Sequence, residues 1–418
     1  MGLKVGVVGL GQFAPSFVQL FEAHPSVSEV YLCEAVRQRL DAAPASAKVT
    51  RRYASFEELL SGDVDAVAIF TQRWMHGPMA LQALAAGKHV YSAVPMGTSV
   101  EEIGAIVDAV ATSKLTYMMG ETSYYYPAAI FCRERMRAGQ FGSFVYGEGE
   151  YLHDMDHGFY DAYRYSGGEG WKATASFPPM FYPTHSVSGI LSVTNAHAVA
   201  VSCLGYRDTA DDGVFDRAVS RWGNDFSNEI ALFRTSDGGT MRICEMRRIG
   251  VPNVEPNVRF SLFGTKGSFE QQTGASVWAT RDTFEDVTPL LQTHAHLQDG
   301  AMPEQGATPE DGDQAQIPMA LRWSFRSGFS SVHDRSLLPP GFVGLPNGHE
   351  GSHQFLVHDF IVACTEGTVP PVNAWAAARY TLPGLIAHES ALRDGELLAI
   401  PDFGDPPRES PLGEPGSS

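Results

Sequence analysis

The string Tyr182-Pro183-Thr184-His185 brings a phenol and an imidazole close together in the chain. Proline suits the first turn of a helix, so we expect His185 just inside a helix N-terminus. The positive end of the helix dipole disfavours imidazolium, which keeps this histidine available as a base. Tyr182 precedes it by a short turn and can reach the same ligand. The pattern allows acid–base chemistry, although the spacing alone favours a packed tyrosine with a hydrogen-bonded histidine.

A second constellation suits a dinucleotide. Gly9, Gly11 and Ala14 form G-x-G-x-x-A between a β-branched run and a helical pattern. The first glycine permits a tight turn, the second a close approach of the pyrophosphate, and the small third residue close helix–strand packing. Glu34 ends the next predicted strand, where a carboxylate binds ribose hydroxyls and repels a 2′-phosphate. The sequence therefore predicts NAD rather than NADP. Two nearby arginines, read as solvated helix charges, are Arg37 and Arg39.

An acidic run offers two further chemistries. Glu148 and Glu150 resemble a glycosidase carboxylate pair, but on a strand they share one face instead of facing each other across a cleft. The string His153-Asp154-Met155-Asp156-His157 resembles metal ligands. It lacks the helical His-x-x-x-His spacing, and consecutive residues cannot all converge on one ion. We expect a solvated strand and no metal site.

Residues 1–121 predict the scaffold of the nucleotide site. Strands alternate with helices over short loops, which is typical of right-handed βαβ units and of a doubly wound parallel Rossmann sheet. The expected strands are 4–10, 30–34, 66–71, 89–92 and 115–120, and the clearest helices are 77–86 and 100–113.

Residues 122–403 predict a second, α+β domain for substrate binding and oligomerisation. Successive strands with few helices between them favour an open, largely antiparallel sheet. The segment near 292–345 has the composition of a long loop, and 404–418 that of a disordered tail. The expected strands are 144–153, 198–204, 229–235, 240–247 and 259–264, and the expected helices are 128–138, 353–365 and 374–393.

The composition limits the partners. The 418 residues carry 48 acidic and 30 basic side chains, a formal charge of −18, which argues against nucleic acid and anionic membranes. The five cysteines are scattered and have no C-x-x-C spacing, which predicts reduced, buried thiols. We recognise neither a signal peptide nor a membrane-spanning run, so we expect a cytoplasmic protein.

These features together resemble the Gfo/Idh/MocA oxidoreductase superfamily over nearly the full length. Besides the glycine turn, the marks are Gly87-Lys88-His89-Val90 and Phe263-Gly264-Thr265-Lys266-Gly267. Most members have Glu-Lys-Pro after the fourth strand, with the lysine beside the reacting hydroxyl. This chain has Ala93-Val94-Pro95, which removes both side chains and counts against a standard dehydrogenase.

A narrower branch is more similar still: the NAD-dependent glycoside hydrolases typified by α-N-acetylgalactosaminidases. Its strings are Trp74-x-His76, Gly147-Glu148-Gly149-x-Tyr151-x-His153-Asp154, Tyr182-Pro183-Thr184-His185, His349-x-Gly351 and Pro401-Asp402-Phe403. The segment before Tyr182 departs from the branch, with Phe177-Pro178-Pro179 in place of polar residues. N-acetylgalactosamine is thus not implied as the substrate, and a related branch acts on sulfoquinovosides.

The resemblance implies the site residues. Catalytic groups would be Tyr182, His185, Tyr151, His153 and Glu121. Cofactor contacts would be Gly9, Gly11, Gln12, Phe13, Glu34, Thr71, Trp74, His76 and Glu121. Substrate contacts would be Tyr124, Lys172 and His349.

The implied reaction is redox-neutral hydrolysis of a pyranoside. It proceeds by transient oxidation at C3, elimination across C1 and C2, addition of water and re-reduction, with NAD returned unchanged. Tyr182 and His185 would act as acid and base at C2 and C3. Tyr151 and His153 would orient the sugar or assist the leaving group, and Glu121 would lie near the nicotinamide. A sugar or cyclitol dehydrogenase and a non-catalytic sugar or NAD sensor remain alternatives. The resemblance also implies a homo-oligomer, dimer or tetramer, formed through the open sheet face.

Overall fold

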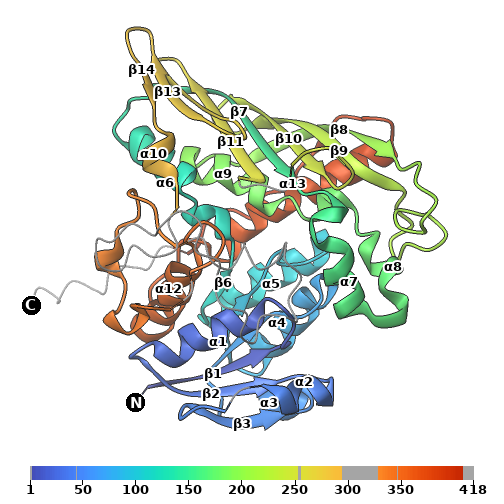
Figure 1. The fold of residues 1–418 in the computed structure, drawn as a ribbon, viewed down its shortest axis with the longest axis vertical. Helices are drawn as coiled ribbons and strands as arrows, with labels where there is room; N and C mark the ends of the chain where they lie inside the picture. The colour runs from blue at the N-terminus through green and yellow to red at the C-terminus, as the bar shows by residue number, and fades with distance from the viewer. Residues whose placement is uncertain (1, 44, 253–255, 294–327, 346, 408–418) are drawn as a thin grey trace, which may run out of the picture.

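The computed structural model describes residues 2–43, 45–252, 256–293, 328–345 and 347–407, which build two sheets (Figure 1). Most of the predicted loop near 292–345 and of the predicted tail lies outside the described residues. The described end of the loop contains two short 3-10 turns, Arg335–Leu337 and Pro340–Phe342.

The first sheet is parallel throughout, in the order β3-β2-β1-β4-β5-β6. The chain starts in the middle, winds outward to β3 and then crosses to β4, so the strand order reverses beside β1. In such sheets ligands bind at this point, outside the carboxyl ends of the strands. The strands are β1 Leu3–Val8, β2 Val27–Cys33, β3 Val49–Tyr53, β4 Ala66–Ile69, β5 His89–Ser92 and β6 Tyr117–Met119.

Helices cover both faces of this sheet. Alternate β1 residues point to opposite sides: Val5 packs with α1 and with α12, whereas Val8 packs with α4 and α5. The helix α12 comes late in the chain yet lies beside α1 (Figure 1). The helices are α1 Ala14–Ala23, α2 Arg37–Ala42, α3 Phe56–Leu60, α4 His76–Ala85, α5 Val100–Ser113 and α12 His353–Glu366.

The second sheet is mixed and largely antiparallel, in the order β14-β13-β12-β11-β7-β10-β9-β8-β15. Only β7 and β10 pair in parallel. The predicted fold class is confirmed. The strands are β7 Phe144–Leu152, β8 Ala198–Arg207, β9 Phe226–Thr235, β10 Thr240–Met246, β11 Val258–Gly264, β12 Gly267–Gln271, β13 Ser276–Thr280, β14 Phe284–Asp286 and β15 Leu398–Ala399.

Helices α6 (Pro127–Arg137), α9 (Thr184–Thr194) and α13 (Ala374–Leu392) lie on the side of this sheet that faces the first sheet (Figure 1). Glycines let α9 rest directly on the strands. A Cβ atom at Gly149 of β7 would lie 2.3 Å from the carbonyl oxygen of Ser186, and one at Gly189 of α9 would lie 1.9 Å from the Phe260 ring. This close packing holds the start of α9 against the end of β7.

Three further features concern the described residues. The acidic strand pair faces away from these helices, where Arg242 bonds Glu150 at 3.0 Å and Arg259 bonds its other oxygen at 2.8 Å. All five cysteines are free thiols, and all but Cys364 are buried. No helix in the described part of the chain is long and apolar enough to span a bilayer.

Candidate active site

The glycine turn between β1 and α1 has the geometry that a pyrophosphate requires. Gly9 has φ of +86°, and a Cβ there would lie 2.9 Å from the carbonyl oxygen of Phe70. A Cβ at Gly11 would meet no atom within 4 Å, so this backbone faces open space. Ala14 is the first residue of α1, and Phe13 at the N-cap makes no side-chain cap. The helix therefore presents its first N–H groups and its positive end to an anion.

Glu34 lies at the end of β2, beside this turn. One carboxylate oxygen accepts the N–H of Leu10 and the other the N–H of Val36, both at 2.8 Å. Each oxygen keeps a lone pair for a ribose hydroxyl. The two neighbouring arginines are engaged elsewhere: Arg37 pairs with Asp41, and Arg39 donates to the backbone of Tyr165.

The segment after β4 contributes Thr71, Trp74 and His76. His76 is buried, and its Nδ1 lies 2.9 Å from the Pro95 carbonyl oxygen while its Nε2 lies 3.1 Å from that of Thr71. Burial lowers the pKa of His76 to about 4. The ring lies between the turn after β4 and the turn after β5, and in its neutral form it donates to one of the two carbonyl oxygens. Trp74 packs edge-on against Trp222, with centroids 5.7 Å apart.

The predicted acid–base residues lie together. The ring centroid of His185 is 5.4 Å from that of Tyr151 and 5.2 Å from that of Tyr182, and the two tyrosines are 6.1 Å apart. His185 is the second residue of α9, directly after Pro183 and Thr184, as the sequence predicted. Tyr151 is the penultimate residue of β7. Two elements held together by glycine contacts thus form the cluster.

Glu121 supports His185 from the first sheet. It follows β6, is fully buried, and its Oε1 lies 2.7 Å from His185 Nδ1. The same oxygen accepts the N–H of Ser123 at 2.8 Å. Burial raises the pKa of this carboxyl, but attraction to His185 and the hydrogen bonds outweigh that effect and hold it below its usual value. His185, on a helix that packs against the second sheet, is therefore paired with the ionised carboxylate of Glu121, which follows the last strand of the first sheet.

Two arginines that the sequence analysis did not identify adjoin the tyrosines. The Arg73 guanidinium lies 4.2 Å from the centroid of Tyr182, and that of Arg247 lies 4.6 Å from the centroid of Tyr151. Burial raises the pKa of Tyr182, and Arg73 opposes this increase. Arg247 also bonds the buried Glu245 at 2.7 Å. Glu245 near the end of β10 and Arg247 just after it form an i, i+2 pair of opposite charge, which is the sequence signal that could have identified them.

His153 lies at the edge of the cluster. Its ring stacks on Phe159 with centroids 3.9 Å apart, and burial together with Arg247 lowers its pKa to about 3. Asp154 caps the next turn by accepting the N–H of Asp156. In the described parts of the chain, no group of three or more His, Cys, Asp or Glu side chains lies close enough together to hold a metal.

His349 connects the cluster to the dinucleotide turn. Its ring lies 5.3 Å from that of Phe13, and its Nδ1 lies 2.9 Å from Nε2 of His353. Burial and the nearby His185 lower the pKa of His349 to about 3. His349 therefore lies close to Phe13 of the predicted cofactor turn and within electrostatic range of His185.

Two predicted substrate contacts lie elsewhere. Tyr124 lines a separate pocket, where the Arg133 guanidinium lies 4.0 Å from its ring centroid. Lys172 is exposed on the short helix α8 (Trp171–Ala175), beside Gly213. No contact joins either side chain to Tyr151, Tyr182 or His185.

Known proteins resemble this chain in sequence and in fold. Residues 3–121 match the family described as "Oxidoreductase family, NAD-binding Rossmann fold" (GFO_IDH_MocA). A "Glycosyl hydrolase family 109 protein" of Streptomyces niveus is 25% identical and is aligned over 96% of this chain and 77% of its own length. One from Saccharopolyspora erythraea is also 25% identical, over 96% and 83%. Among solved structures, myo-inositol 2-dehydrogenase from Lactobacillus plantarum superposes with a TM-score of 0.67 at 16% identity, over 96% of this chain and all of that one.

The protein is thus an NAD-binding enzyme whose residues 3–121 match the Gfo/Idh/MocA oxidoreductase family, and the predicted cofactor is confirmed. Within that class, the predicted resemblance to the glycoside hydrolase branch is also confirmed, since relatives so named align with nearly the whole chain.

Proposed function

We propose that the protein is an NAD-dependent glycoside hydrolase that acts on a pyranoside through proton transfers at C2. The observation that carries the proposal is the Glu121–His185 pair beside Tyr151 and Tyr182, adjacent to the dinucleotide turn. When bound, NAD supplies reversible oxidation at C3, which makes the neighbouring C2 proton acidic. Names of full-length relatives support the same class of reaction.

The protein's own residues divide the proton transfers. When His185 donates Nδ1–H to Glu121, its Nε2 keeps a free lone pair and can accept a proton. Tyr182 lies next to it and exchanges a proton with the sugar hydroxyl, favoured by the adjacent Arg73 cation. Tyr151 and His153 orient the sugar and assist the leaving group, and Glu121 stabilises the imidazolium that forms.

The position of the acidic strand pair supports this route. Glu148 and Glu150 face away from the cluster and bind Arg242 and Arg259, so they do not flank a sugar beside the cofactor turn. A reaction with tyrosine and histidine as its Brønsted groups needs no such carboxylate pair.

The second candidate is a sugar or cyclitol dehydrogenase, which the inositol dehydrogenase fold favours. Val94 is buried at the place where dehydrogenases of the superfamily have lysine, which counts against it. A non-catalytic sensor would bind NAD without turnover.

The test is phenol release from a panel of aryl glycosides with added NAD⁺, while NADH absorbance is followed in parallel. We expect release that requires NAD⁺, without net NADH, and that is lost in Tyr182→Phe and His185→Ala. Tyr206→Phe, on the exposed sheet face, is the matched control and should keep full activity. Stoichiometric NADH without phenol release would establish the dehydrogenase instead.

We further propose a homo-oligomer formed through the uncovered face of the second sheet. Leu204, Ile230 and Leu232 project from it with 64%, 44% and 60% of their surface exposed. Adjacent apolar side chains of this size favour a partner surface. Leu204→Asp combined with Leu232→Asp should reduce the molar mass measured by light scattering, whereas an unchanged mass would contradict this interface.

A further inference from the structure

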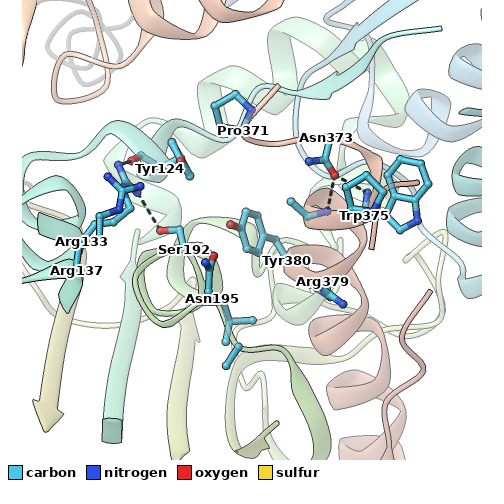
Figure 2. Close-up of a pocket in the computed structure, with 14 residues that line it drawn as sticks. Tyr124, Arg133, Arg137, Ser192, Asn195, Pro371, Asn373, Trp375, Arg379 and Tyr380 are labelled. Atoms are coloured by element: carbon cyan, nitrogen blue, oxygen red, sulfur yellow. Dashed lines mark hydrogen bonds between the residues drawn. The ribbon is translucent and has the colours of Figure 1, made fainter. Parts of the chain in front are cut away.

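A polar cavity of about 210 Å³ lies apart from the active site, between α6, the last turn of α9 and the first turns of α13 (Figure 2). Its walls include Tyr124, Arg133, Arg137, Trp375, Arg379 and Tyr380. Nothing in the proposed reaction uses it.

The charge of this cavity is opposite to that of the protein. The chain has a formal charge of −18, yet three arginines line the cavity and none of its described lining residues is Asp or Glu. The charge of Arg379 is neutralised by protein side chains, because its guanidinium pairs with Asp402 and Asp405 at 2.8 Å. Arg133 and Arg137 form no ion pair with any described residue. The cavity therefore has two uncompensated cations.

Of these two arginines, Arg133 gives the stronger evidence for a bound anion. Only 8% of it is exposed, and the described residues supply acceptors for two of its five N–H groups: the Tyr124 carbonyl oxygen at 2.8 Å and Ser192 Oγ at 3.3 Å. Burial lowers the pKa of this guanidinium, and the neighbouring Arg137 adds to that effect. A buried cation beside a like charge is costly unless an anion accompanies it.

The surrounding elements favour the same ligand. Arg133 and Arg137 are four residues apart, so they share one face of α6. Asn373, Trp375 and Ala376 place the N-terminal end of the long helix α13 at the cavity. Asn373 already caps the N–H groups of Trp375 and Ala376, so this end attracts an anion through the helix dipole alone. The last turn of α9 opposes this with its carbonyl groups, and the arginines outweigh it.

We propose that this cavity is a second ligand site, which binds a small metabolite through a phosphate or carboxylate group held by Arg133 and Arg137. Tyr124 and Trp375 provide aromatic surface for the remainder of the molecule. The site is linked to the active site by two elements. Helix α9 carries His185 at its start and Ser192 at the cavity, and Tyr124 closely follows Glu121 in the chain.

The test is calorimetric titration of the full-length protein with inorganic phosphate and, separately, with citrate. Saturating NAD is present, so that the pyrophosphate site is filled. We expect at least one of these anions to bind, and Arg137→Ala to weaken that binding about tenfold, the usual effect of one charge-assisted hydrogen bond. Phosphate binding alone would indicate a phosphorylated ligand, and citrate binding alone a carboxylated one.

Two further variants complete the test. Arg281→Ala removes an exposed arginine from the β13–β14 turn and should bind the anion as the wild type does. Arg133→Gln should abolish binding, and Arg137→Ala, at an exposed position, covers the case in which the buried variant does not fold. Failure of both anions to bind, or unchanged affinity in Arg137→Ala, would overturn the proposal while leaving the hydrolase assay untouched.

Discussion

Replacing Glu121 by glutamine removes one charge from the proposed catalytic pair and keeps its shape. The carboxylate lies 2.7 Å from His185 Nδ1 in a fully buried position. With an effective dielectric constant of ~20, unit charges at this separation attract by roughly 6 kcal/mol. Desolvation and the amide's remaining hydrogen bond offset part of this, so we expect a net loss of about 3 kcal/mol when the imidazolium forms. That corresponds to about a 100-fold decrease in kcat.

The chain offers a matched control for this variant. Glu229 is equally buried and lies 2.7 Å from His388 Nδ1, but this pair belongs to the core between β9 and α13. Both Glu121→Gln and Glu229→Gln should lower the thermal midpoint, whereas only Glu121→Gln should lower kcat about 100-fold with the aryl glycoside assay. A kcat for Glu121→Gln within about threefold of the wild type, where ~0.65 kcal/mol separates the barriers, would refute the role assigned to the pair. So would an equal loss in Glu229→Gln.

Three other outcomes follow from the structure. Glu34→Ala should weaken NAD binding about tenfold by calorimetry, since it removes the ribose acceptor; unchanged affinity would contradict the site. Gly149→Ala places a Cβ 2.3 Å from the Ser186 carbonyl oxygen and should cost about 1–3 kcal/mol in urea unfolding, whereas Gly274→Ala, with open space around it, should cost little. The lowered pKa of Glu121 implies stability that is present above pH 4.5 and lost as the pH falls through the folded value, so the wild type should lose more stability on acidification than Glu121→Gln.

Much of the first sheet could be predicted because its strands are apolar and its helices amphipathic. The strand 89–92 and the helix 100–113 agree with the structure to the residue. Strand β3 was not predicted, because Val49–Tyr53 forms the sheet edge and has two exposed arginines. Strands β12 to β15 are short and lie at or near the edges of the second sheet. They contain too few residues to show a clear alternation of apolar and polar side chains, the pattern that would predict a strand. The position of α12 beside α1 depends on tertiary contacts that no local pattern encodes.

The sequence likewise predicted one part of the candidate site and missed another. Proline before His185 predicted the helix start, and the glycine turn predicted the cofactor cradle, because both signals are local. Arg73 and Arg247 were not identified, because they reach the tyrosines from segments far apart in the chain, one after β4 and the other after β10. Tyr124 and Lys172 were expected from resemblance alone, and the structure places both outside the cluster.

The central claim is that His185 and its neighbours remove and return a proton at C2 of the sugar. The direct measurement is hydrolysis of an aryl glycoside in deuterium oxide with NAD⁺, with the product sugar analysed by NMR. We predict deuterium at C2 of the product, and none in unreacted controls without NAD⁺. Glycoside hydrolysis that leaves C2 free of deuterium would contradict the account.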